Sequence, residues 1–139
     1  MVDVSAKPPM HRQAIARGEI RLQLATLRLI ERNQIAKGNV LAAARLAGIM
    51  AAKKTGELIP LCHPLPITHC EVQFEIPPAR DRVVITASAS ITAQTGVEME
   101  ALTAVSVAAL TIYDMCKAVD KQMRITDVAL VSKTKQPVE

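Results

Sequence analysis

A carboxylate and an amine lie one helical turn apart near the end of the longest apolar stretch of the sequence. Asp114 and Lys117 are i and i+3 partners, which share one face of an α-helix. The turn before them is apolar on all sides, so we expect the pair to be partly buried, where its proton affinities depend on its surroundings. Such a pair can donate and accept protons in acid–base catalysis. The alternative is an interior salt bridge.

A proline-rich segment holds a cysteine and a histidine, in the order Leu61-Cys62-His63-Pro64. Prolines cannot lie inside a helix, so this segment is a stiff loop that positions its side chains rigidly. His63 can donate a hydrogen bond to a phosphate or transfer a proton near neutral pH. The alternative is a structural loop around a buried histidine with satisfied hydrogen bonds.

Two glutamates stand at the predicted start of the long helix. Thr95 and Glu98 have the spacing of a capping box, with Thr95 as the N-cap. Acidic residues in a first helical turn are also favoured by the helix dipole. Glu98 is largely explained in this way, and Glu100 less so.

Lysines at turns and at the ends of elements form a fourth group: Lys37, Lys53, Lys54 and Lys133. A solvated surface position is the default reading of any one of them. The sequence has no glycine-rich phosphate loop, nucleophile elbow, zinc motif or dinucleotide fingerprint.

The spacing of two candidate residues predicts a site shared between copies of the chain. Glu100 and Asp114 are fourteen residues apart on one predicted helix, which is about 21 Å at 1.5 Å per residue. One small ligand cannot readily touch both within a single chain. In an isologous two-fold contact the start of one helix faces the end of its twin. The middle of the helix is apolar on nearly every side, and we expect its second face to meet another subunit.

Hydrophobic periodicity and turn signals give the order of the elements. Strands are predicted at 12–22, 68–76, 82–92 and 123–132, and helices at 24–33, 40–54 and 95–119. Asn39 is expected to cap the second helix and Gly56 to lie just past its end. The β-α-α-β-β-α-β order predicts an α+β fold: a ferredoxin-like, mostly antiparallel sheet covered by helices on one face, with an added helix.

Composition limits the classes of protein that remain. The 139 residues suit a single domain (1–139), half of them hydrophobic, with Phe74 and Tyr113 as the only aromatic residues. The net charge is +4, and residues 1–69 hold 10 basic against 4 acidic side chains, which suits phosphates. Three cysteines at wide spacing favour reduced thiols in a cytoplasmic protein. No signal peptide or membrane span is predicted.

Six segments together resemble the molybdenum cofactor biosynthesis protein C family, the cyclic pyranopterin monophosphate synthases. They are Met-Val-Asp-Val-Ser-Ala-Lys (1–7), Lys-Gly-Asn-Val (37–40), Ala-Ala-Lys-Lys-Thr (51–55), Leu-Ile-Pro-Leu-Cys-His-Pro-Leu (58–65), Thr-Gly-Val-Glu-Met-Glu-Ala-Leu-Thr-Ala (95–104) and Ala-Leu-Thr-Ile-Tyr-Asp-Met-Cys-Lys-Ala-Val (109–119). The tail 132–137 departs from the pattern, because it lacks a glycine-rich stretch.

The resemblance implies a lyase that converts (8S)-3',8-cyclo-7,8-dihydroguanosine 5'-triphosphate, a cyclised dihydro-GTP, to cyclic pyranopterin monophosphate and pyrophosphate. By motif position, Asp114 and Lys117 are the implied catalytic pair. The implied substrate-binding residues are Leu61, Cys62, His63, Met99, Glu100, Lys37, Lys53 and Lys133. The resemblance also implies a homohexamer, a trimer of dimers with active sites at the dimer interface. No cofactor or metal is expected to be required, and Mg²⁺ can accompany the triphosphate.

Two other classes of function compete with the enzyme. An RNA-binding module would explain the basic half, but RNA-binding sheets stack bases on aromatic side chains, and two rings cannot supply that platform. We therefore expect no nucleic-acid partner. A purely structural oligomer would tolerate replacement of Asp114, Lys117 and His63.

Overall fold

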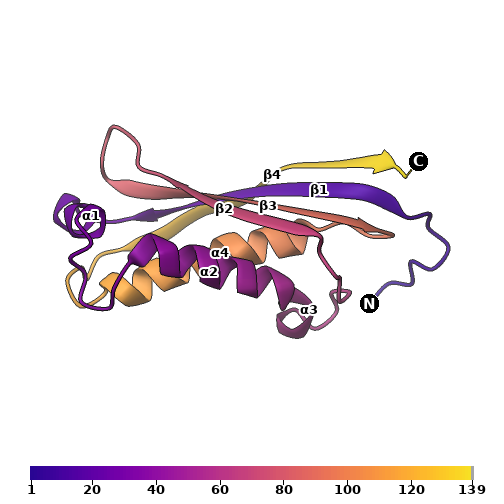
Figure 1. Cartoon of the computed structure of the whole chain (residues 1–139), viewed down its shortest axis with the longest axis horizontal. Helices are drawn as coiled ribbons and strands as arrows, with labels where there is room; N and C mark the ends of the chain where they lie inside the picture. The colour runs from indigo at the N-terminus through magenta and orange to yellow at the C-terminus, as the bar shows by residue number, and fades with distance from the viewer. Residues whose placement is uncertain (139) are drawn as a thin grey trace.

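An antiparallel sheet forms one layer of the molecule and two long helices form the other (Figure 1). The computed structural model describes residues 1–138. Its strands are β1 (Met10–Arg21), β2 (His69–Glu75), β3 (Arg82–Ala93) and β4 (Arg124–Pro137), and its helices are α1 (Leu24–Glu31), α2 (Val40–Lys53), α3 (Thr55–Leu58) and α4 (Glu98–Cys116). The strand order is β2-β3-β1-β4. Helices α2 and α4 cover one face, and α1 lies at one end of the sheet. The α+β, ferredoxin-like prediction is confirmed.

Small side chains bring α4 close to the centre of the sheet. Ala14 and Ala16 of β1 pair with Ala89 and Ala87 of β3, and all four are buried. The residues of α4 that are fully buried include Ala101, Ala104 and Ala108. Alanine on both surfaces lets a helix and a sheet approach closely without cavities. This packing fixes α4, and hence both ends of α4, relative to the sheet.

The predicted end of the second helix is partly wrong. Asn39 caps α2 as expected, because its side-chain oxygen accepts a hydrogen bond from Ala42 N at 3.1 Å. Gly56, however, does not end the helical region but lies inside the short helix α3. The buried Thr55 hydroxyl donates to the carbonyls of Ala51 and Ala52, which continues the last turn of α2 into α3.

The predicted capping box is also wrong. Helix α4 begins at Glu98, so Val97 is its N-cap, and no side chain caps it. Thr95 stands two residues too early to reach the first turn. The Glu98 carboxylate instead lies 3.3 Å from the Lys133 amine. A pairing across the fold therefore replaces the local one.

Two further element ends differ from the sequence prediction by three residues or more. Helix α4 ends at Cys116 rather than near 119, although Lys117 still has helical backbone angles. Strand β4 continues to Pro137 rather than 132, because it pairs with β1 as far as the Met10–Pro137 position. The extension places Lys133 within a strand.

Part of the second face of α4 is covered by α2 of the same chain, and not by another subunit as expected. A stripe remains outside this contact: Met99 and Tyr113 are each 37% exposed and Leu110 is 57% exposed. Within the described residues, α4 is the one helix long and apolar enough to suit a membrane by length and composition. Half of it is buried inside the fold, as in a core helix.

Candidate active site

The carboxyl end of α4 brings three charged groups into one cluster. Lys117 Nζ lies 2.8 Å from Asp114 Oδ1, and Lys37 Nζ lies 2.9 Å from Asp114 Oδ2. Lys37 comes from the turn before α2, where Gly38 has a φ of +116° that disfavours any other residue. We call Lys37, Asp114 and Lys117 the α4-end cluster. One carboxylate there holds two amines at a fixed separation.

The charges of the α4-end cluster reinforce each other. Hydrogen bonds from Lys117 and then Lys37, aided by their positive charges, lower the pKa of Asp114 to about 2. The hydrogen bond that Lys117 donates to the Asp114 carboxylate in turn raises the pKa of Lys117. At neutral pH Asp114 is therefore ionised and Lys117 holds its proton.

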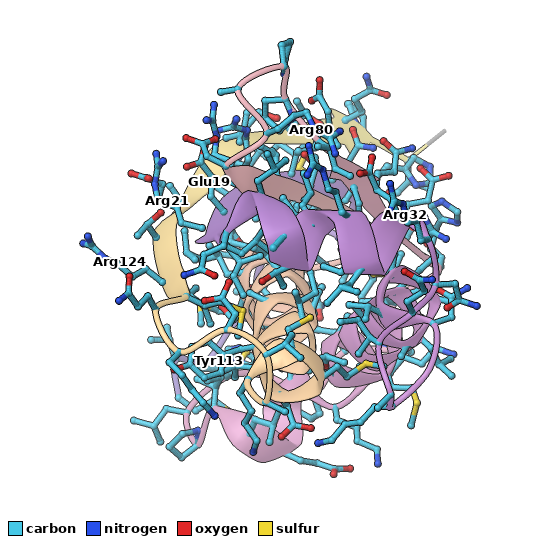
Figure 2. All side chains as sticks on the ribbon, turned by 90° about the vertical axis from the view of Figure 1, so that its left-hand side faces the viewer. Glu19, Arg21, Arg32, Arg80, Tyr113 and Arg124 are labelled. Atoms are coloured by element: carbon cyan, nitrogen blue, oxygen red, sulfur yellow. The ribbon has the colours of Figure 1, made fainter. Side chains whose placement is uncertain are left out.

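The expected burial of the Asp114–Lys117 pair is not provided by a single chain. The two side chains are 54% and 57% exposed. The apolar turn before them contains Leu110 and Tyr113, which are themselves exposed. Figure 2 faces this end of the molecule, with Tyr113 at the end of α4 and Arg21 and Arg124 beside the sheet. The prediction assumed that this turn was covered on all sides, and within one chain it is not.

Arginines surround a carboxylate of the sheet at this end. Glu19 of β1 is 6% exposed and lies 3.6, 3.5 and 3.2 Å from Arg17, Arg21 and Arg82. Arg21 and Arg82 also lie 3.3 and 2.8 Å from Asp81, so three guanidinium groups share two carboxylates (Figure 2). Gly18 faces Val105 of α4, so the adjacent Glu19 and its partners lie on the opposite face of the sheet.

The predicted proline-rich loop lies against the start of α4. Leu61, Cys62, His63 and Met99 line one cavity of about 290 Å³. The loop packs so closely on α3 that residue 56 must be glycine, because a methyl group at that position would lie 2.8 Å from the Pro64 Cα. We call the site residues at the start of α4 the loop cluster; it contains Leu61, Cys62, His63, Met99, Glu100, Lys53 and Lys133.

His63 and Cys62 have different capacities within this cavity. His63 Nε2 lies 2.6 Å from the Val2 carbonyl oxygen, so this nitrogen donates, and the amino-terminal segment lies beside the loop. Partial burial and the charges of Glu100 and Glu98 raise the pKa of the Cys62 thiol. Cys62 therefore remains a thiol at neutral pH, which disfavours a nucleophilic role.

Glu100 is the most deeply buried of the predicted site residues. It is 1% exposed, and its Oε1 has no hydrogen-bond partner within residues 1–138. Glu100 and Lys53 line an adjoining cavity of about 300 Å³. Burial, and secondarily the nearby charge of Glu98, raises the pKa of Glu100. This carboxyl can carry a proton at a higher pH than an exposed glutamate.

At pH 7.5 a Glu100→Gln variant is expected to have a free energy of unfolding roughly 1 kcal/mol higher than the wild type. The reason is that the variant buries no charge without a partner. The pKa of Glu100 is raised in the folded state, so its contribution to stability is complete below pH 4.5 and is lost as pH rises through the folded pKa. Urea denaturation at pH 4.5 and 7.5 measures the difference. Glu75→Gln, on the exposed face of β2, is the control. A variant with the same pH dependence as the wild type contradicts the prediction.

A third cavity, of about 190 Å³, contains residues that the sequence prediction missed. Its lining includes Arg12, Glu98, Lys133 and Lys135. Arg12 donates hydrogen bonds to the carbonyls of Ala93 and Gln94 in the segment before α4. The register between β1 and β4 could have revealed these residues, because Arg12 pairs directly with Lys135. That register depends on the carboxyl-terminal extension of β4, which the prediction omitted.

The structure thus divides the predicted residues between the two ends of α4. Lys37, Asp114 and Lys117 gather at its end, and the loop cluster gathers at its start. Glu100 and Asp114 remain about 21 Å apart along the helix axis. Within residues 1–138, no group of three or more His, Cys, Asp or Glu side chains could hold a metal ion.

Comparison with known proteins identifies the family of the chain. Residues 1–136 match the MoaC family. Proteins named cyclic pyranopterin monophosphate synthase are 59% identical in Rhodospirillum rubrum and 58% identical in Heliobacterium modesticaldum, each over 134 residues. These matches cover 96% of this chain and 81% and 84% of the two relatives. A protein of the same name from Desulforapulum autotrophicum is 59% identical over 134 residues, 96% of this chain and 82% of the relative. The chain therefore belongs to the MoaC family.

Proposed function

We propose that this protein is a cyclic pyranopterin monophosphate synthase of molybdenum cofactor biosynthesis. It converts (8S)-3',8-cyclo-7,8-dihydroguanosine 5'-triphosphate to cyclic pyranopterin monophosphate and releases pyrophosphate, as a phosphorus–oxygen lyase. The observation that carries the proposal is the match of residues 1–136 to the family, with the acid–base pair and the cations in place.

The reaction opens a purine-derived ring, closes a pyran ring and closes a cyclic phosphate. In the last step a substrate hydroxyl oxygen bonds to the α-phosphorus, and the bond to the pyrophosphate oxygen breaks. These steps move protons and build negative charge on oxygen, so they need acid–base groups and cations. The protein offers both kinds of group and needs no resident metal or cofactor; Mg²⁺ can accompany the triphosphate.

The roles of the α4-end cluster follow from its charges. Lys117 transfers protons, and Asp114 keeps it protonated until the substrate accepts a proton. Lys37, Lys53 and Lys133, with His63, hold the triphosphate. Cys62, Leu61 and Met99 form the wall of the loop cavity, and Glu100 stands beside Lys53 in the adjoining cavity.

The active site is completed by a second copy of the chain. In a two-fold dimer the α4-end cluster of one copy faces the loop cluster of the other, which removes the 21 Å separation. The exposed stripe of Met99, Leu110 and Tyr113 on α4 supplies apolar surface for this contact. We propose a homohexamer, a trimer of such dimers, in the cytoplasm. The three free cysteines suit that reducing compartment.

The competing RNA-binding function gains no support from the positions of the two aromatic rings. Phe74 lies among the core side chains, with the Arg45 guanidinium 5.4 Å from its ring centre. Tyr113 lies on α4. The open face of the sheet therefore presents no aromatic ring for stacking bases.

The test is to incubate the purified protein with the cyclised dihydro-GTP and to measure pyrophosphate and the pterin product together. Equimolar release of both is expected. The Rhodospirillum rubrum relative serves as a positive control in the same assay. Absence of both products while the relative is active would overturn the proposed function.

An Asp114→Asn variant is expected to shift the alkaline limb of the rate profile to lower pH. The Asp114 carboxylate raises the pKa of Lys117, so without that charge Lys117 loses its proton at a lower pH. The measurement is kcat from pH 6 to pH 11. Asp127→Asn, on exposed β4, is the control. An unshifted alkaline limb contradicts the assignment of Lys117 as the proton donor.

A further inference from the structure

Three cations converge on one corner of the molecule where only one carboxylate is present to balance them. Arg12, Lys133 and Lys135 line the cavity of about 190 Å³ with Glu98. Glu98 is already held by Lys133, at 3.3 Å. The cavity is therefore left with a surplus of positive charge.

The strand register places two of these cations opposite each other, which is unfavourable when no anion lies between them. Arg12 of β1 stands directly opposite Lys135 of β4. Like charges in directly opposed positions of an antiparallel pair destabilise the sheet. Lys133 pairs with Ala14, which faces the helices, so it lies on the same side of the sheet as Arg12 and Lys135. An anion between these side chains would relieve the repulsion.

The groups in the cavity are not equally free to bind an anion. The Arg12 guanidinium donates from Nε to Ala93 O at 3.1 Å and from one terminal nitrogen to Gln94 O at 3.4 Å. Lys133 is shared with Glu98. Lys135 has no ion pair within residues 1–138. Lys135 is thus the cation most available to a ligand.

The cavity is below the size of a nucleotide site and suits a small polyanion. Pockets for whole organic ligands are about 300–1,000 Å³. One or two phosphate groups, which accept hydrogen bonds on every side, match three converging cations. The cavity also adjoins the loop cluster, because Gly96 and Glu98 line both.

We infer that Lys135 is a further substrate-binding residue, which holds the terminal phosphates of the triphosphate and the pyrophosphate that leaves. This inference rests on the proposed function. Lys135 binds these phosphates as a point charge beside Arg12 and Lys133 and touches no reacting ring. Its loss therefore weakens binding equally in the ground and transition states.

The test uses Lys135→Gln in the full-length protein, with inorganic pyrophosphate as the probe. Calorimetric affinity for pyrophosphate is expected to fall roughly tenfold, as for the loss of one charge-assisted hydrogen bond. KM for the cyclised dihydro-GTP is expected to rise by a similar factor, with kcat within about twofold. Lys135→Arg retains the charge and is expected to restore most of the affinity.

Two further measurements distinguish binding at this site from a general effect of surface charge. Without ligand, Lys135→Gln is expected to melt no lower than the wild type, because the repulsion with Arg12 is gone, while the rise in Tm with pyrophosphate shrinks. Lys121→Gln, on the exposed turn before β4, is the matched control and is expected to bind pyrophosphate like the wild type.

The outcomes distinguish the inference from the proposed function. Unchanged pyrophosphate affinity and KM in Lys135→Gln would overturn the inference, as would an equal loss in Lys121→Gln. If the wild type forms no pterin product but binds pyrophosphate through Lys135, the proposed function fails and the anion site stands.

Discussion

A Lys117→Ala variant is expected to lose about 10²- to 10⁴-fold in kcat, the usual contribution of a positioned proton-transfer group. Lys117 Nζ lies 2.8 Å from the Asp114 carboxylate, which holds its proton in place. The loss should appear in single-turnover formation of the pterin product, because product release is then excluded. KM should change little if Lys117 acts mainly in the transition state.

The fold of this variant is expected to be unaffected. Asp114 and Lys117 are both more than half exposed, and exposed ion pairs contribute little to stability. Asp114 also retains its contact with Lys37 at 2.9 Å. Lys121→Ala, four residues further along the chain, controls for removal of an exposed amine. Near-normal single-turnover rates in Lys117→Ala would refute the assigned role.

Mixing two inactive variants is expected to restore activity if the site lies between copies. Asp114→Ala removes the carboxylate of the α4-end cluster, and Glu100→Ala removes the carboxyl group of the loop cluster, so neither variant alone has a site with both groups. In a mixed dimer one site combines both defects and the other has none. Random mixing makes half of the dimers mixed, so about a quarter of wild-type activity should return.

The mixing experiment needs proof that mixed oligomers form. Two affinity tags, one on each variant, allow mixed assemblies to be isolated in sequence before the assay. Asp114→Ala mixed with Lys117→Ala is the matched control, because both changes lie in one cluster and no site is repaired. Isolated mixed oligomers without recovered activity would show that the two clusters do not share a site.

The strands were predictable because one face of each is buried. Period-two alternation between Ala14, Ala16 and Ile20 is the direct result of packing against α4, and the pairing with β3 confirms it. The Asn39 cap was equally local, since Asn39 directly precedes α2 and its side chain bonds to Ala42, three residues along the chain. Such features depend on neighbours in the sequence, and the sequence pattern contains them.

The start of α4 was not predictable because it depends on a residue far away in the sequence. Glu98 has the spacing of a capping box, yet in the fold its carboxylate pairs with Lys133, 35 residues away. The competing partner is supplied by the extension of β4. A tertiary contact thus determines the partner of the Glu98 carboxylate, although the local sequence offers an equally reasonable one.

The grouping of the candidate residues was predictable in part. Helix geometry alone separates Glu100 from Asp114, and the structure retains that separation. The exposure of Asp114 was not predictable, because an apolar turn can be covered by its own chain or by another one. Arg12 and Lys135 were missed because their meeting depends on the register between the first and last strands.

The central position of β1 has a consequence for synthesis of the chain. Strand β1 is synthesised before both of its partners, β3 on one side and β4 on the other, and the β4 residues that pair with it lie 103 to 127 positions later in the chain. The second edge of β1 therefore stays unpaired until β4 has been made. Contacts of such long sequence separation form slowly. The sheet is therefore completed only when β4 joins it, and until then the free edge of β1 can pair with strands of other chains.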